Sequence, residues 1–130
     1  MAVERERSIE DVIRSDGRYP PEAYAFLHEG MARAAKTVHG EEVIGAQRHV
    51  TGQQICQACR EMAVERYGQL ARTVLNRWNV RSTMDLGNMV YLLIENKFMK
   101  KTEEDSLEDF RNVYDFEEAF RLQDEFELKE

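Results

Sequence analysis

Two cysteines and two histidines give the sequence its sharpest candidate for chemistry. Cys56 and Cys59 stand three residues apart, and His39 and His49 precede them. Two thiolates and two imidazoles would satisfy a tetrahedral zinc ion. However, the cysteines fall inside a helical pattern that starts at Thr51, and free cysteine is commonly a buried core residue. We therefore interpret the pair as packing and expect no metal and no other cofactor.

A redox role for the cysteine pair is disfavoured, because Cys-X-X-Cys chemistry needs an exposed thiolate, normally at a helix N-terminus after a strand. The scarcity of cysteine instead indicates a reducing, cytoplasmic setting. The opening sequence MAVERERSIEDV lacks the apolar core of a secretory signal. No apolar run approaches the length of roughly 18 residues that a membrane span needs. We expect a cytoplasmic protein with no membrane contact.

A second candidate is a set of basic residues that could contact phosphates of a nucleic acid. It comprises Arg72, Arg77, Arg81, Lys100 and Lys101. Three of these residues lie within residues 80–81 and 98–101. These two segments could pair as two short strands around a helix in a winged-helix layout. The other interpretation of both segments is a turn followed by coil. No aromatic residues interleave with the basic ones as in single-strand binding, so we favour salt bridges from these residues to the acidic tail.

The net charge of −7 is unevenly distributed along the chain. From Thr102 onward there are twelve acidic and three basic residues, a net of −9, whereas residues 1–101 carry thirteen acidic and fifteen basic residues, a net of +2. A near-neutral body argues against a general phosphate-binding protein, which would present a basic face. Residues 103–109 carry several carboxylates but lack the alternating ligands and the glycine of a calcium loop. We therefore interpret this segment as a solvated acidic loop.

Four aromatic residues near the C-terminal end are the candidates for protein interaction. They are Phe110, Tyr114, Phe116 and Phe120. So many large apolar groups either fold back on the body of the protein or present a helical face to a partner. We favour folding back, and in either case the segment indicates packing and recognition rather than catalysis.

The periodicity of apolar residues predicts helices over residues 3–15, 21–38, 51–67, 70–78 and 82–95. Start signals lie at Ser8, Thr51 and Ser82, with Gln54 and Asp85 at capping-box spacing after the last two. We expect a mainly α, compact single-domain bundle of five to six helices over residues 1–120. The small two-stranded element stays open, and residues 121–130 form an acidic tail that we expect to be partly disordered.

The strings RYPPEAYAFLHEGM, RHVTGQQI, LNRWNVRSTMDLGNMVYLLIE, KTEEDSLEDF and YDFEEAF cover about residues 9–120. In combination they resemble an uncharacterised family of small bacterial proteins largely restricted to Planctomycetes and Verrucomicrobia. The resemblance implies a free-standing cytoplasmic protein. That family has no assigned activity, cofactor or catalytic residue, so the resemblance adds no site residue.

The sequence contains no glycine-rich phosphate loop and no nucleophile elbow. We therefore expect a non-catalytic protein-interaction or adaptor module, whose partner is another protein. The alternative is a winged-helix-like nucleic-acid-associated protein that uses the basic set. A third class, a zinc-dependent or redox protein, would use the cysteines and histidines.

Overall fold

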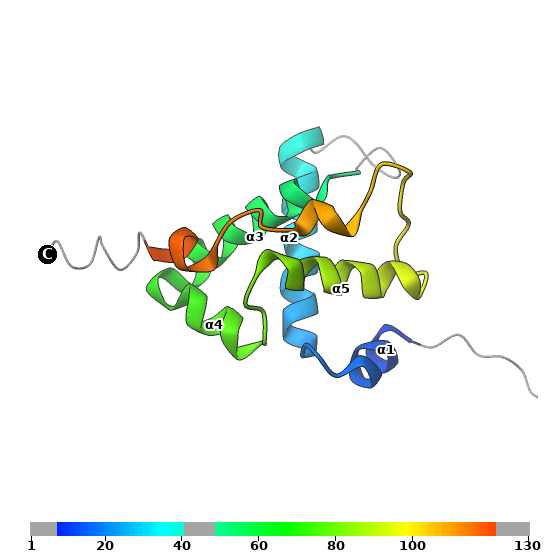
Figure 1. Ribbon diagram of the computed structural model, residues 1–130, viewed down its shortest axis with the longest axis horizontal. Coiled ribbons are helices and arrows are strands. Elements are labelled where there is room, and N and C mark those ends of the chain that lie inside the picture. Colours follow the sequence, from blue (N-terminus) through cyan, green and yellow to red (C-terminus); the bar gives the residue numbers. More distant parts are fainter. Residues whose placement is uncertain (1–7, 41–48, 122–130) are drawn as a thin grey trace, which may run out of the picture.

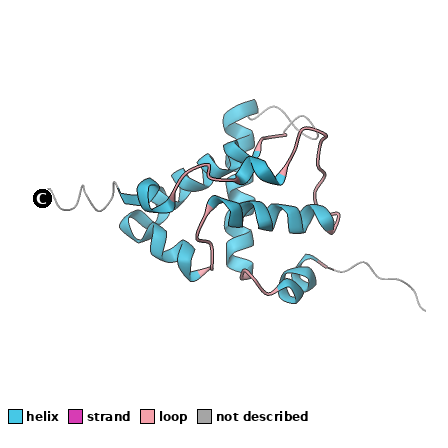
Figure 2. Ribbon diagram, in the orientation of Figure 1, coloured by secondary structure: helices cyan, strands magenta, loops and turns pink. Residues whose placement is uncertain are grey.

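The computed structural model describes residues 8–40 and 49–121, and within these ranges the chain is built of helices and loops, without strands. The α-helices are α1 (Ile9–Asp16), α2 (Pro21–His39), α3 (Gly52–Tyr67), α4 (Ala71–Arg77) and α5 (Thr83–Glu95). Two 3₁₀ turns, η2 (Gly68–Leu70) and η3 (Leu107–Phe110), join them, and residues 116–121 are also helical. Figure 2 shows this all-helical architecture, which confirms the predicted fold class.

Parts of two predictions fall outside the described residues. They are the first turns of the helix predicted over residues 3–15 and the acidic tail beyond Arg121, including its expected partial disorder.

The predicted helix starts are confirmed by their hydrogen bonds. The Ser8 side chain accepts the Asp11 N–H, and Thr51 forms a reciprocal capping box with Gln54. Each cap satisfies backbone N–H groups that the first helical turn leaves without a partner. These bonds fix where α1 and α3 begin, and a similar cap at α5 belongs to the polar cluster described below.

The proposed pair of strands is wrong, because both segments are helix C-termini. Asn79 (φ 67°) follows α4, and Lys97 (φ 68°) follows α5. After them, Val80 N–H donates to Leu75 O and Phe98 N–H donates to Leu93 O, both at 2.9 Å. This left-handed residue followed by a 6→1 bond is a Schellman motif. The backbone N–H groups of Val80 and Phe98 therefore donate to carbonyl groups of α4 and α5 and are not available to a neighbouring strand.

One hydrophobic core joins residues from α1 to the helical residues 116–121. The most extensive helix contact is between α2 and α3. At their crossing, Gly30 faces Cys59 so closely that a Cβ at position 30 would lie 2.5 Å from the Cys59 Sγ. The glycine is therefore what lets the two backbones approach, and the Cys59 side chain fills the contact.

Phe110 packs the segment after α5 against two helices, α3 and α5. Its ring lies against Gly52 of α3 and Gly87 of α5, where an added Cβ would come within 2.9 Å and 2.7 Å of it. The Thr83 hydroxyl donates to Phe110 O at 2.6 Å and accepts the Val113 N–H at 3.2 Å. Figure 1 shows the result: the chain leaves the end of α5, turns back and lays η3 alongside α5 and the start of α3.

Candidate functional site

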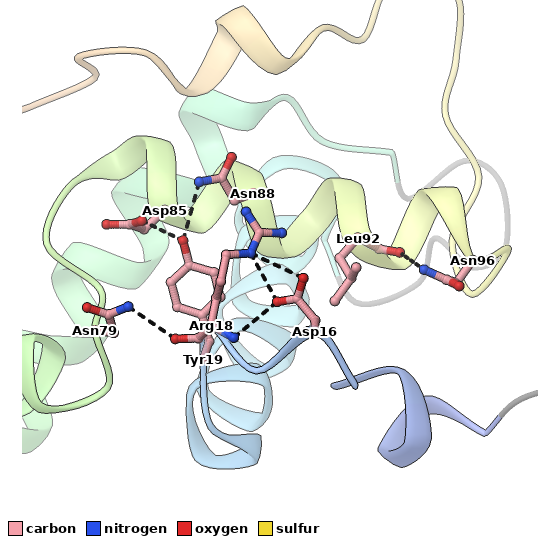
Figure 3. Close-up of polar contacts among 8 residues, drawn as sticks. All are labelled: Asp16, Arg18, Tyr19, Asn79, Asp85, Asn88, Leu92 and Asn96. Carbon is pink, nitrogen blue, oxygen red and sulfur yellow. Dashed lines mark hydrogen bonds and ion pairs between the residues drawn. The ribbon is translucent and has the colours of Figure 1, made fainter. Parts of the chain in front are cut away.

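The polar cluster around Tyr19 ties the link between α1 and α2 to the start of α5 (Figure 3). The Tyr19 hydroxyl donates to Asp85 Oδ1 at 2.5 Å and accepts from Asn88 Nδ2 at 3.3 Å. Burial, followed by the bond to Asp85, raises the pKa of Tyr19 to about 12. The phenol therefore stays protonated at neutral pH and acts as a donor.

Asp85 is fully occupied by this arrangement. Besides Tyr19, its carboxylate accepts the backbone N–H of Arg81 at 2.8 Å and of Ser82 at 3.2 Å. Its two oxygens therefore hold three donors of the chain itself. The cluster thus joins the N-terminus of α5 to the link between α1 and α2.

The structure does not gather the cysteines and histidines into one site. Cys56 and Cys59 are buried in the core as free thiols. Burial raises both pKa values, that of Cys59 to about 12, so both thiols stay protonated. His39 Nε2 contacts His49 O at 2.5 Å. No group of three or more His, Cys, Asp or Glu side chains within residues 8–40 and 49–121 could hold a metal ion.

The basic set divides between the two ends of α5. Arg72 and Arg81 line a polar hollow of about 400 Å³ at the N-terminal end, together with Asp115 and Glu117. Lys100 and Lys101 line a different pocket, beyond the C-terminal end; these two lysines and the two arginines do not share one pocket.

The expected salt bridges to the acidic tail are not among the ion pairs of the described residues. Arg66 pairs with Glu29 of α2, and Arg33 of α2 pairs with Glu65 of α3 at 2.6 Å. The remaining arginine pairs join neighbours within a few residues, such as Arg111 with Glu108 at 2.7 Å. The body thus holds its own surface pairs, and such exposed pairs contribute little stability.

The four aromatic residues fold back on the body, as the favoured alternative predicts. Phe110, Phe116 and Phe120 are buried. Tyr114 is half-buried and donates its hydroxyl to Cys56 O at 2.7 Å. Its ring stacks on Phe116, and Phe120 meets both rings edge to face. The rings are thus largely enclosed by the chain's own core.

A half-enclosed pocket of about 460 Å³ lies beside the C-terminal half of α5. We call it the apolar pocket. Its walls come from α2, the start of α3, α5 and the chain between α5 and η3. The apolar lining residues are Met31, Val50, Ile55, Val90, Ile94, Met99 and Phe110. A volume of this size with mostly apolar walls is typical of ligand-binding pockets in proteins.

Polar groups surround the apolar pocket. Asp105 accepts the Thr102 N–H at 2.8 Å and lies 3.1 Å from His49 Nε2. Asp109 accepts the Ser106 N–H at 3.2 Å. These bonds shape the loop that forms one wall of the pocket.

Tyr91 also lines the apolar pocket, and its buried hydroxyl has no hydrogen-bond partner in the described part of the chain. Burial raises the pKa of Tyr91, with smaller contributions from Asp105 and Asp109. The hydroxyl is therefore a protonated donor without an acceptor.

Sequence reasoning missed the apolar pocket, although α5 carried a signal. Tyr91 and Leu92 extend the apolar character of α5 beyond one face. A helix that is apolar on more than one side must be covered on more than one side. The segment that covers this side includes residues 103–109, whose carboxylates predict a solvated loop, so the sequence gives no sign of the incomplete cover.

Comparisons with known proteins do not assign the chain to a family. No protein-family model matches the chain, and neither the curated proteins nor the solved structures yield a significant match. Within the described residues, no helix is both long and apolar enough to cross a membrane.

Proposed function

We propose that the protein is a non-catalytic protein-interaction module, and that its partner places an apolar side chain in the apolar pocket. The pocket supports this proposal because apolar walls inside a polar rim are the usual anatomy of a protein interface. Of the four aromatic residues selected from the sequence, Phe110 remains part of this interface, since it lines the pocket.

The ionisable groups favour binding over catalysis. Burial raises the pKa of the buried thiols and of Tyr19, Tyr24 and Tyr114, which keeps each group in its neutral form. A nucleophile or general base would instead need a pKa moved toward neutrality. This supports the proposal that the protein binds rather than transforms its partner.

A pair of matched substitutions tests the proposal. Met99→Asp places a charge in the apolar pocket, and Leu70→Asp makes the same kind of change at a side chain that is 59% exposed on η2. Burial of an unpaired charge at an interface anchor should weaken binding by about tenfold or more. We expect quantitative capture from an extract of the producing cells to lose specific proteins with Met99→Asp and to keep them with Leu70→Asp.

The captured proteins are compared only between variants that remain folded. Thermal unfolding first establishes that both variants remain folded. Identical captured proteins for both variants and the parent would contradict a role for the pocket.

The nucleic-acid alternative is the weaker proposal. The two segments on which the winged-helix layout depended follow helix C-termini instead of forming strands. Four of the five basic residues divide between two pockets, and Arg77 lines neither of these. Arg72 and Arg81 do share the polar hollow, but Asp115 and Glu117 share it too. Retention of the protein on duplex DNA or RNA at low salt, lost as salt rises, would reverse this preference.

A further inference from the structure

The rim of the apolar pocket carries charges of both signs, two lysines and two aspartates. Lys100 and Lys101 line the pocket, are exposed, and take part in none of the ion pairs of the described residues. By contrast, the rim carboxylates of Asp105 and Asp109 each accept a backbone N–H of their own segment. The two glutamates at positions 103–104 do not line the pocket. An occupant therefore meets apolar walls, two ammonium groups outside the ion pairs of the described residues, and two carboxylates that already accept hydrogen bonds from their own segment.

Residues 122–130, LQDEFELKE, have the complementary chemistry. Leu122, Phe126 and Leu128 alternate with four carboxylates and one lysine, and Phe126 is flanked by Glu125 and Glu127. An aromatic side chain is the preferred anchor for a buried interface pocket. Carboxylates on both sides of it would meet the rim lysines.

The position of this segment favours a second copy as its host. Residues 116 and 117 line the polar hollow at the N-terminal end of α5, whereas the apolar pocket lies at the other end. Figure 1 shows residues 116–121 at the opposite side of the molecule from the chain that follows α5. From residue 121, the five residues to Phe126 span at most about 18 Å, and α5 alone is about 20 Å long.

We propose that the apolar pocket of one copy receives Phe126 and its flanking carboxylates from a second copy, so that the chain self-associates. This inference rests on the proposed function and names the partner as the chain itself. The rim lysines select the acidic segment, and the pocket walls bind the ring.

Sedimentation of the full chain over a range of concentrations tests self-association. We expect a concentration-dependent dimer or larger species that weakens as salt rises, because the rim contacts are exposed charges. Phe126→Ala should weaken the association by about tenfold or more. Ile9→Ala, at an exposed position on α1, is the matched control and should leave it unchanged.

A charge exchange tests the contact itself. Lys100→Glu with Lys101→Glu should weaken association, and mixing that variant with one that carries Glu125→Lys and Glu127→Lys should restore it. Failure of the mixture to associate, when each variant alone remains folded, would contradict the proposed pairing of these charges.

Isotopically mixed samples separate a second copy from the chain's own tail. One copy is ¹⁵N-labelled, and the other carries a spin label on Gln123→Cys; Cys56 and Cys59 are buried and leave the new thiol as the reactive one. We expect broadening at Ile94 and Met99 of the ¹⁵N-labelled copy. Broadening only when both labels share one chain would assign the pocket to the chain's own tail. A monomer at all concentrations with no broadening would also overturn the inference, while the Met99→Asp capture test would still decide the proposed function.

Discussion

The two ends of α5 differ in how completely their polar groups are used. At the N-terminal end, Asp85 accepts three hydrogen bonds, and Thr83 bridges to the segment after η3. At the C-terminal end, the Tyr91 hydroxyl has no described acceptor, and Lys100 and Lys101 take part in no ion pair of the described residues. The N-terminal end thus has hydrogen-bonded anchors beside the polar hollow, whereas the C-terminal end faces the apolar pocket.

This difference separates groups that hold the fold from groups that are available to a partner. A half-buried carboxylate with three donors is costly to disturb, because its removal leaves those donors without their acceptor. A rim lysine without a partner can change at little cost to stability. We therefore expect substitutions at the N-terminal end to affect folding and those at the C-terminal end to affect binding.

The largest expected effect is that of Phe110→Ala, which removes the ring shared by both ends. Loss of a buried phenylalanine should lower the free energy of unfolding by about 3–5 kcal/mol. Chemical denaturation measures this free energy. Phe98→Ala is the control, because Phe98 is 38% exposed and its removal should lower the free energy of unfolding far less. Equal losses for the two variants would mean that Phe110 does not lie between Gly52 and Gly87 as described.

A smaller effect is expected from removing one carboxylate at each end of α5. Asp85→Ala loses a helix cap and the bond from Tyr19, and should cost about 2–3 kcal/mol. Asp105→Ala loses one bond from Thr102 N–H and the contact with His49, and should cost about 1 kcal/mol. Denaturation of both variants at pH 7 compares them. A larger loss for Asp105→Ala would reverse the assignment of anchored and available ends.

The smaller effect at the N-terminal end is that of Tyr19→Phe, about 1–2 kcal/mol at pH 7 for a hydrogen bond to a charged acceptor. The folded state raises the pKa of Tyr19 from 10.0 to about 12. A raised pKa means that the stabilisation is complete below pH 10 and is lost as the pH rises toward 12. The difference in stability between the parent and Tyr19→Phe should therefore shrink across that window.

Tyr24→Phe is the matched control for this measurement, because the buried Tyr24 hydroxyl has no hydrogen-bond partner in the described residues. Removing it should leave stability at pH 7 unchanged or slightly higher. A parent-to-variant difference for Tyr19→Phe that stays constant from pH 8 to beyond pH 11 would mean that the folded state does not raise the pKa of Tyr19.

The helix starts could be predicted because their determinants are local. A cap such as Thr51 with Gln54 depends on residues three positions apart, so sequence spacing contains all the information needed. The burial of the aromatic segment was also predictable, since several large rings within a few residues must find apolar cover.

The sequence left the two short strands open as an alternative, because short apolar segments after helices resemble short strands. Asn79 was a readable signal, because asparagine is the commonest residue after glycine to take the left-handed conformation that ends a helix. Lys97 gave no such signal, although it adopts the same conformation. The apolar pocket could not be predicted, because its walls come from four segments that only the tertiary structure brings together.

The ring of Phe110 between two glycines has an evolutionary consequence. A methyl group at position 52 or 87 would occupy the space of the ring, so neither glycine can change while residue 110 stays large. We expect descendants of this sequence to retain all three residues or to exchange them in concert, with a smaller residue at 110 compensating for alanine at 87. Mutational drift at these three positions would then be coupled, even though they are far apart in the chain.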